Sequence, residues 1–144
     1  MNEWKVYSDG GCVPNPGPAA WGAVIETPAG ELLERSAFIG AGTNQIAELT
    51  GALEGLRLTP AGATVILICD SQYVLKGLTE WRRGWERRNW HNAQGEPVAN
   101  AALWLQLFAI ADKRQVQTQW VRGHTGHAQN ERADALATQA LRSA

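Results

Sequence analysis

The sequence lacks most features of secreted and membrane proteins. Of its 144 residues only two are cysteines, Cys12 and Cys69, which is too few for a disulfide framework and favours a reducing compartment. Its unbroken apolar runs are short, as at residues 65–69, and none could span a bilayer. The first residues show no basic stretch followed by an apolar segment, so no secretory signal is expected. These absences predict a soluble, cytoplasmic protein with no membrane partner.

An excess of positive charge is also missing. Thirteen Lys and Arg residues stand against fourteen Asp and Glu residues, giving a net charge of −1. Binding of nucleic acid by bulk charge is therefore excluded, and such binding would need a local basic patch. The sequence also has no G-x-x-x-x-G-K-[ST], G-x-G-x-x-G, H-E-x-x-H or G-x-S-x-G motif. Nucleoside triphosphatase, dinucleotide-dependent and serine-hydrolase activities thus lose their usual support.

The composition is that of one globular domain, with 44% hydrophobic and 19% charged residues. Short apolar stretches typical of strands alternate with segments of helical periodicity. The predicted strands are residues 4–8, 21–26, 32–39, 64–69 and 116–121, the predicted loop is residues 12–18, and the predicted helices are residues 44–59, 71–79, 100–111 and 128–141. This order predicts an α/β fold over residues 1–144, with one mixed sheet and helices on both faces.

Two aspartates follow predicted strands. Asp9 precedes Gly10-Gly11 at the end of the first strand, and Asp70 follows the most apolar strand. In open α/β sheets, sites form at the carboxyl ends of strands, so the two carboxylates meet if these strands are parallel neighbours. Each residue also has a plain structural interpretation, Asp9 as a turn residue and Asp70 as a helix cap.

Two further acids lie in predicted helices. Glu48 shares one side of its helix with small residues at positions 51, 52 and 55, which would let that helix approach another element closely. Asp134 lies in the last helix. A solvated glutamate and a surface aspartate are the alternatives. If all four acids converged, their repulsion would require cations or protons, and oxygen ligands favour Mg²⁺ or Mn²⁺ over Zn²⁺.

The segment Arg122-Gly123-His124-Thr125-Gly126-His127 places His124 between glycines. Mobility of this kind suits a proton shuttle near neutral pH, and a plain exposed loop histidine is the alternative. His124 and His127 could also suggest zinc. Because Cys12 and Cys69 are distant from them in sequence, a zinc site is disfavoured.

Residues 81–91 form a local basic segment with a charge of +3, against −4 for the other 133 residues. Its arginines are Arg82, Arg83, Arg87 and Arg88, interleaved with Trp81, Trp85 and Trp90. Arginines contact phosphates and tryptophans cover sugars or bases, which favours nucleic-acid binding. The alternative is an amphipathic helix whose tryptophans pack on the body while its arginines face water. Both can hold at once, because Trp81 and Trp85 share a face at i, i+4.

Together these residues resemble the bacterial type 1 ribonuclease H family (ribonuclease HI). Four stretches carry the resemblance, in order and over nearly the whole chain: SDGGCVPNPGPAAWG (8–22), TNQIAELTGALEGL (43–56), CDSQYV (69–74) and WVRGHTGHAQNERADALA (120–137). The resemblance implies a five-stranded mixed sheet with helices on both faces and a basic helical protrusion. It also implies an endonuclease that cleaves the RNA strand of RNA–DNA hybrids, leaving 5′-phosphate and 3′-hydroxyl ends.

The resemblance also assigns the catalytic residues. The family's four metal-binding acids fall on Asp9, Glu48, Asp70 and Asp134, and its mobile histidine falls on His124. We therefore expect two Mg²⁺ ions with the substrate, with Mn²⁺ as a substitute and Asp9 bridging both ions. One ion would activate the attacking water, and the other would stabilise the leaving 3′-oxygen.

Substrate contacts are implied as well. Residues expected along the minor groove of the hybrid are Cys12, Asn15, Asn44 and Gln45, with Gln72 nearby. Thr43 and Asn100 would form a pocket for a DNA phosphate. The basic protrusion falls on residues 81–92 and would hold the DNA strand through Trp81 and Trp85. Gln45 stands where the family often has a second asparagine, so the side chain that carries the amide is longer at this position.

We expect a monomer with no protein partner. Two other classes remain open, namely a non-catalytic hybrid-binding module and another nuclease or integrase of the same fold. The four acids and His124 argue against the first class. The tryptophan-rich protrusion and the Gly-His loop argue against the second.

Overall fold

The computed structural model describes residues 3–122 and 127–143. Its strands are β1 (Glu3–Cys12), β2 (Gly17–Glu26), β3 (Leu32–Gly42), β4 (Thr64–Cys69) and β5 (Gln115–Trp120). Its helices are α1 (Asn44–Arg57), α2 (Gln72–Lys76), α3 (Arg82–Arg87), α4 (Ala101–Asp112) and α5 (Ala128–Arg142), with a π-helical turn, η1 (Gly77–Trp81), between α2 and α3. The element order is the one that the sequence predicts.

The strands form one five-stranded mixed sheet in the order β3-β2-β1-β4-β5. The pairs β1–β2 and β2–β3 are antiparallel, whereas β1–β4 and β4–β5 are parallel. The parallel pairing of β1 with β4 confirms the arrangement on which the meeting of two acids depends. The two strands that precede those acids are neighbours and run the same way.

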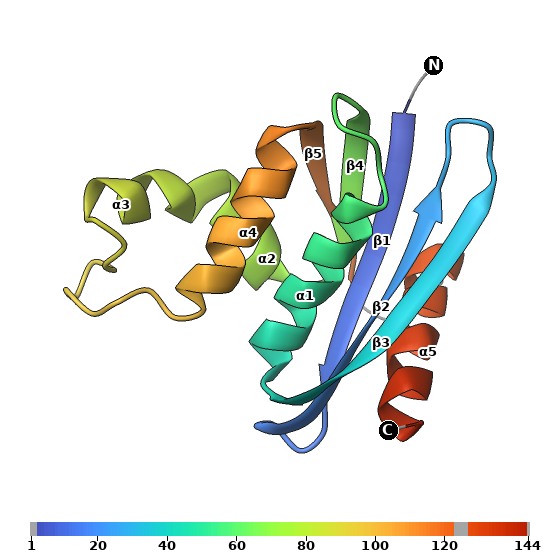
Figure 1. The fold of residues 1–144 in the computed structure, drawn as a ribbon, viewed down its shortest axis with the longest axis horizontal. Coiled ribbons are helices and arrows are strands. Elements are labelled where there is room, and N and C mark those ends of the chain that lie inside the picture. The colour runs from blue at the N-terminus through green and yellow to red at the C-terminus, as the bar shows by residue number, and fades with distance from the viewer. Residues whose placement is uncertain (1–2, 123–126, 144) are drawn as a thin grey trace.

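Helices cover both faces of the sheet, as expected (Figure 1). Alternate residues of β1 point to opposite faces, so Val6 joins the apolar cluster beneath α1 and α4, while Tyr7 joins the cluster beneath α5. Trp104 and Phe108 of α4 are among the largest fully buried side chains. The largest apolar cluster therefore lies between the sheet and the pair α1 and α4, and it provides a rigid base for the edge where the strands end.

The first strand is longer than predicted. It does not end at Asp9 but continues through Gly10 and Gly11 to Cys12, because β2 pairs with it over that whole length. The backbone hydrogen bonds with β2 stabilise the extended conformation here more than the turn preference of two glycines opposes it. The pairing of β1 with β4, however, stops at Tyr7, so Asp9 still lies just beyond the end of the parallel pair.

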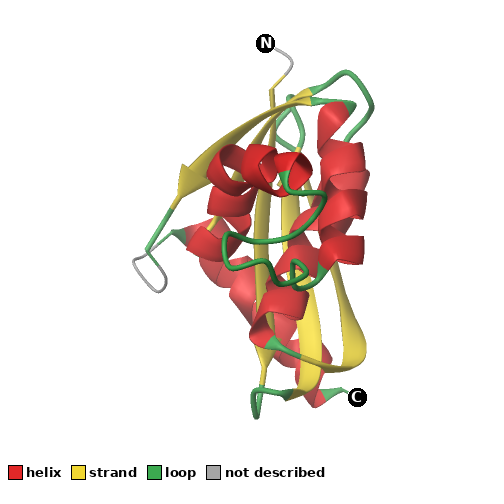
Figure 2. Ribbon diagram, turned by 90° about the vertical axis from the view of Figure 1, so that its left-hand side faces the viewer, coloured by secondary structure: helices red, strands yellow, loops and turns green. Residues whose placement is uncertain are grey.

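The predicted helix over residues 71–79 is also different in the structure. Its residues belong to α2 and to the π-helical turn η1, and the short helix α3 follows and extends away from the body (Figure 1). Figure 2 shows the molecule from the side on which α3 lies. At Gly77 a Cβ atom would collide with Cη2 of Trp104, so only glycine permits this approach. Helical periodicity does not reveal a π-helical turn, which changes the direction of the chain at the base of the protrusion.

Candidate active site

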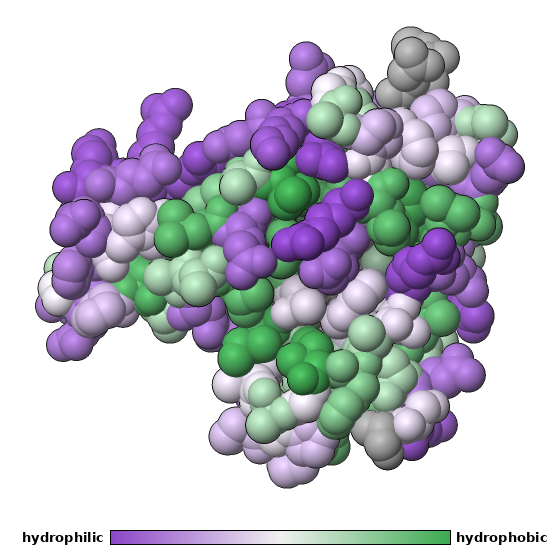
Figure 3. Space-filling view, in the orientation of Figure 1, coloured by the Kyte–Doolittle hydropathy of each residue, from purple (hydrophilic) through white to green (hydrophobic). Residues whose placement is uncertain are grey.

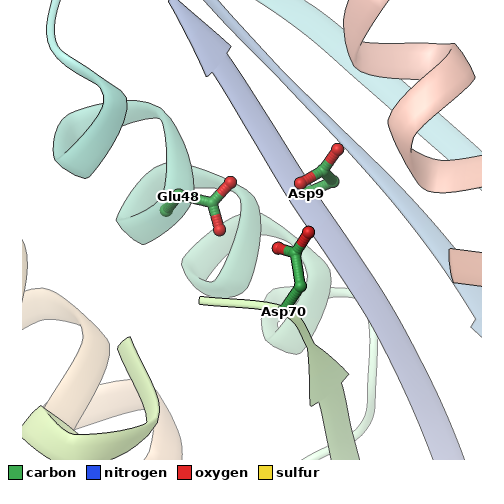
Figure 4. Close-up of side chains that lie close together, drawn as sticks. All are labelled: Asp9, Glu48 and Asp70. Atoms are coloured by element: carbon green, nitrogen blue, oxygen red, sulfur yellow. The ribbon is translucent and has the colours of Figure 1, made fainter. Parts of the chain in front are cut away.

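Three of the predicted acids meet at the edge where β1 and β4 end. Asp9 comes from β1, Glu48 from α1, and Asp70 from the residue that follows β4. Each offers a carboxylate oxygen, and these oxygens all lie within 4.8 Å of one another (Figure 4). Asp9 is buried, and the other two are partly buried. The convergence that the sequence predicts for Asp9 and Asp70 is confirmed, and Glu48 joins them.

The close approach of α1 to β1 places Glu48 in this group. A Cβ atom on Gly51 would lie 2.8 Å from the carbonyl oxygen of Asp9, and one on Gly10 would overlap the carbonyl carbon of Ala47. The backbone N–H of Gly10 donates to Oε1 of Glu48 at 2.7 Å. The small side of α1 therefore packs on the strand, as its glycines predict, and it does so at backbone contact.

The electrostatics of the cluster are unfavourable without a cation. Burial raises the pKa of Asp9, and the neighbouring Glu48, Asp134 and Asp70 raise it further. Burial, followed by the charge of Asp70, raises the pKa of Glu48, although hydrogen bonds from Gly10 and Ser71 act in the opposite direction. Carboxylates that repel one another at this range fit a divalent cation that prefers oxygen ligands, such as Mg²⁺ or Mn²⁺.

Asp134 occupies a different position from the other three acids. It lies on α5, partly buried, and it is near enough to Asp9 to raise the pKa of that acid. Among the described residues, the compact carboxylate group contains Asp9, Glu48 and Asp70 only. The structure thus brings all four predicted acids into one region, with three in mutual reach and the fourth near Asp9.

The predicted histidine, His124, lies outside the described residues. Its neighbours Arg122 and His127 are described, and both are exposed. Cys12 and Cys69 are free and buried, and burial raises the pKa of the Cys69 thiol. In the part of the chain that the structure describes, the candidate metal group therefore contains carboxylates alone, without the sulfur or imidazole ligands typical of zinc.

The loop after β1 is joined to the start of α1. Oδ1 of Asn15 accepts a hydrogen bond from the backbone N–H of Asn44 at 3.1 Å, so the amide nitrogen of Asn15 keeps its donors for a ligand. The thiol of Cys12 is buried and donates to the carbonyl of Pro14 at 3.2 Å. The Cys12 side chain is therefore not available for a substrate contact in this conformation. Three further amide side chains are exposed near the acids in sequence: Asn44 and Gln45 begin α1, which carries Glu48, and Gln72 begins α2, two positions after Asp70.

Two residues expected to bind a DNA phosphate have structural partners as well. Thr43 caps α1, because its side-chain oxygen accepts from the backbone N–H of Ile46 at 3.1 Å. Asn100 stands at the start of α4 as predicted, in a left-handed conformation, but its side chain makes no cap hydrogen bond. It donates instead to the hydroxyl of Tyr73 at 3.2 Å.

The protrusion combines packed tryptophans with exposed arginines, as predicted. The ring centroids of Trp81 and Trp85 are 5.8 Å apart, and Trp85 also packs on Trp104 of the body. Three arginines are exposed, and the hydrophilic surface over the protrusion is visible at the left of Figure 3. Residues that line a hollow of about 610 Å³ there are Glu80, Trp81, Arg83, Gly84, Trp85, Arg87, Arg88 and Ala93.

Arg82 differs from the other arginines of the segment. Its guanidinium donates to both carboxylate oxygens of Asp112 at 2.6 and 2.7 Å, and it lies 4.5 Å from the ring centroid of Phe108. The Arg82 charge is thus paired within the protein, and its place on the basic binding surface remains a prediction. Its charge is used to attach the protrusion to α4, a contact that spans thirty residues of sequence and that local charge cannot reveal.

Sequence reasoning missed two groups that contact the acids. The hydroxyl of Ser71 accepts from the backbone N–H of Val74 as a helix cap, and it also lowers the pKa of the nearby Glu48. The indole Nε1–H of Trp120 donates to the carbonyl of Asp70 at 3.1 Å. Ser71 directly follows an acid and could have been found from that position. Trp120 carries no local signal, because its partner is fifty residues away.

Comparisons with known proteins agree with this geometry. The family model described as RNase H matches residues 1–142. A ribonuclease H of Methylorubrum extorquens is 51% identical over 139 residues, which are 96% of this chain and 60% of that protein. A ribonuclease H of Cupriavidus necator is 45% identical over 145 residues, which cover 99% of this chain and 98% of that protein.

Solved structures match equally well. LC9-RNase H1, a type 1 RNase H with the type 2 active-site motif, superposes with a TM-score of 0.86 at 31% identity, over 99% of this chain and 74% of that one. LC11-RNase H1, solved in complex with an RNA/DNA hybrid, gives a TM-score of 0.71 at 25% identity, over 97% of both chains. In the described residues, no helix has the length and apolar character needed to cross a membrane.

Proposed function

The chain belongs to the RNase H family and carries that family's endoribonuclease activity on RNA–DNA hybrids, and we propose that Asp9, Glu48, Asp70 and Asp134 perform it with divalent metal ions. The observation that carries this proposal is the group of carboxylate oxygens within 4.8 Å of one another at the ends of β1 and β4. Such a group is costly unless cations neutralise it, and its ligands suit hard ions.

Two Mg²⁺ ions, for which Mn²⁺ substitutes, would be held with the substrate by these acids. When bound, they supply an attacking water of lowered pKa and neutralise charge on the leaving 3′-oxygen, giving 5′-phosphate and 3′-hydroxyl products. Asp9 would contribute to holding both ions. Glu48 is kept in place by the Gly10 N–H, which donates to its carboxylate at 2.7 Å.

Asp134 and His124 have roles at the margin of this group. Asp134 lies near Asp9, which supports its assignment to one of the two ions. His124, between its glycines, would move a proton or assist release of the product. Its assignment rests on the sequence resemblance.

The hybrid would lie across the acids with its minor groove against the loop after β1 and the start of α1. Amide side chains there can hydrogen-bond sugar and base edges, and contacts to 2′-hydroxyls distinguish the RNA strand. The DNA strand would lie against the protrusion, where tryptophan rings and exposed arginines provide stacking and phosphate contacts. The residues that we propose for these contacts are Cys12, Asn15, Thr43, Asn44, Gln45, Gln72, Trp81, Trp85, Arg83, Arg87, Arg88 and Asn100.

Cleavage of a hybrid whose RNA strand carries a 5′ label tests the activity. We expect cleavage with Mg²⁺, none with EDTA, and none in the variants D9N and D70N, which should still bind the hybrid. E31Q, which changes an exposed carboxylate in the turn between β2 and β3, serves as the control and should cleave normally. Mg²⁺-dependent cleavage retained in both D9N and D70N would refute the assignment of the acids.

The same assay separates the alternatives. Double-stranded DNA and double-stranded RNA of the same sequence should not be cut. Equal cleavage of either duplex would favour another nuclease of this fold, and binding without cleavage of any substrate would favour a binding module. We also propose that the protein acts in the cytoplasm as a monomer; its two free, buried cysteines support a reducing compartment, and sedimentation would test the monomer.

A further inference from the structure

Trp120 is an unusual residue for its position. It is the last residue of β5, the strand at one edge of the sheet, and it is 45% exposed. Among the described residues, the three apolar core clusters and the paired aromatic rings do not include it. Core packing therefore does not explain why this tryptophan is held where it is.

Hydrogen bonding explains its position. The indole Nε1–H donates to the backbone carbonyl of Asp70 at 3.1 Å. The next residue, Val121, donates its backbone N–H to the carbonyl of Cys69 at 3.0 Å. The consecutive carbonyls of Cys69 and Asp70 thus accept hydrogen bonds from Val121 and from the Trp120 side chain. The indole N–H therefore supplies a hydrogen bond at the position just beyond the last paired residues of β4 and β5.

These bonds determine the direction of the peptide between Asp70 and Ser71. That peptide connects Asp70, one of the three clustered acids, to Ser71, whose hydroxyl caps α2 by accepting from the backbone N–H of Val74. Trp120 also lines a hollow of about 240 Å³ whose other lining residues include Gln72, Lys76 and Thr118. Without the indole N–H, the Asp70 carbonyl would lose this donor, and the orientation of the peptide would be less restricted.

We propose that Trp120 is a positioning residue, whose indole N–H holds Asp70 in the orientation that binds the metal ions. The inference rests on the proposed function, because it requires Asp70 to be a metal ligand. Residues that orient metal ligands typically change metal affinity or activity by about 10- to 100-fold when they are mutated. A defect in metal binding, and not in substrate binding, is the expected signature.

Two variants separate the N–H group from the bulk of the ring. W120F keeps an aromatic ring but removes the donor, and W120A removes both. W4F is the matched control, because Trp4 is partly buried on the neighbouring parallel strand β1, opposite Val65 at the far end of β4. Each variant is measured for Mg²⁺ at half-maximal cleavage, for the rise in Tm on adding Mg²⁺ without substrate, and for hybrid affinity in EDTA.

For W120F we expect half-saturation at a Mg²⁺ concentration higher by on the order of 10-fold, a smaller Mg²⁺-induced rise in Tm, and unchanged hybrid affinity. W120A should be no worse than W120F in its Mg²⁺ requirement, and W4F should match the parent protein. The proposal is overturned if W120F has the parent's Mg²⁺ requirement and only W120A is impaired, since packing would then be the cause. If the parent protein itself does not cleave the hybrid with Mg²⁺, the proposed function is refuted, and not only the role of Trp120.

Discussion

Replacing Asp9 with asparagine should stabilise the metal-free protein while it abolishes cleavage. The substitution keeps the shape of the side chain and removes a charge that lies within 4.8 Å of two other carboxylates. At that separation two unit charges repel by about 1 kcal/mol at a dielectric constant of ~80 and about 3.5 kcal/mol at ~20. We expect a gain of about 1–3 kcal/mol in EDTA at pH 8, or roughly 2–10 °C in Tm.

The gain should depend on pH with a definite sign. The pKa of Asp9 is raised in the folded protein, so its charged form is less favourable there than in the unfolded chain. The penalty is absent below the unfolded pKa of about 3.9 and grows as the pH rises towards the raised folded value. The difference in Tm between D9N and the parent protein should therefore be negligible near pH 3.5 and largest at alkaline pH.

Thermal unfolding in EDTA across this pH range, followed by titration with Mg²⁺, measures both effects. Mg²⁺ should raise the Tm of the parent protein. At a Mg²⁺ concentration of 100 times the Kd, the free energy of unfolding should increase by about 2.7 kcal/mol. The increase for D9N should be much smaller. D112N is the control with the opposite sign, because Arg82 lowers the pKa of Asp112. It should be slightly destabilised at neutral pH, lose that difference in acid, and respond normally to Mg²⁺. A D9N variant less stable than the parent in EDTA at pH 8 would refute the electrostatic reasoning.

Three further predictions concern other parts of the molecule. Changing Arg87 and Arg88 to glutamine should weaken hybrid binding. The slope of log K against log salt concentration should become shallower by about 0.9 for each phosphate that the protein no longer neutralises. Binding titrations at several salt concentrations measure this slope, and an unchanged slope would contradict the prediction. T43A should lose about 1 kcal/mol through loss of the cap of α1, whereas T43S should keep it, as measured by urea unfolding. R114M should lose about 1–3 kcal/mol, because the guanidinium donates to the hydroxyl and carbonyl of Thr59, yet its Mg²⁺ requirement should not change.

Local pattern was sufficient for much of the fold and of the site. The run over residues 64–69 is apolar on both faces, so its prediction as a covered central strand matches β4 at both ends. The small residues beside Glu48 predicted a close helix contact, and Gly51 and Gly55 provide it against β1. In both cases the information is contained within one element, which is why the sequence alone revealed it.

Features that depend on distant partners could not be predicted. The extension of β1 through Gly10 and Gly11 depends on pairing with β2, and the π-helical turn depends on the ring of Trp104 against Gly77. The use of Arg82 as a tie to α4 depends on an aspartate thirty positions away. In each case a tertiary contact overrides the local preference of the residue, so no window of sequence contains the answer.

The bare backbone contacts at Gly10 and Gly51 have a consequence for protein engineering. Because no side chain separates helix from strand at these two positions, no rotamer can adjust the gap, and the main chains themselves set the spacing of the acids. A designer who transplants the acids onto another sheet-and-helix scaffold must therefore copy these glycines before the carboxylates. A single methyl group at either place would act as a wedge, and well-chosen ligands would then stand too far apart to share an ion.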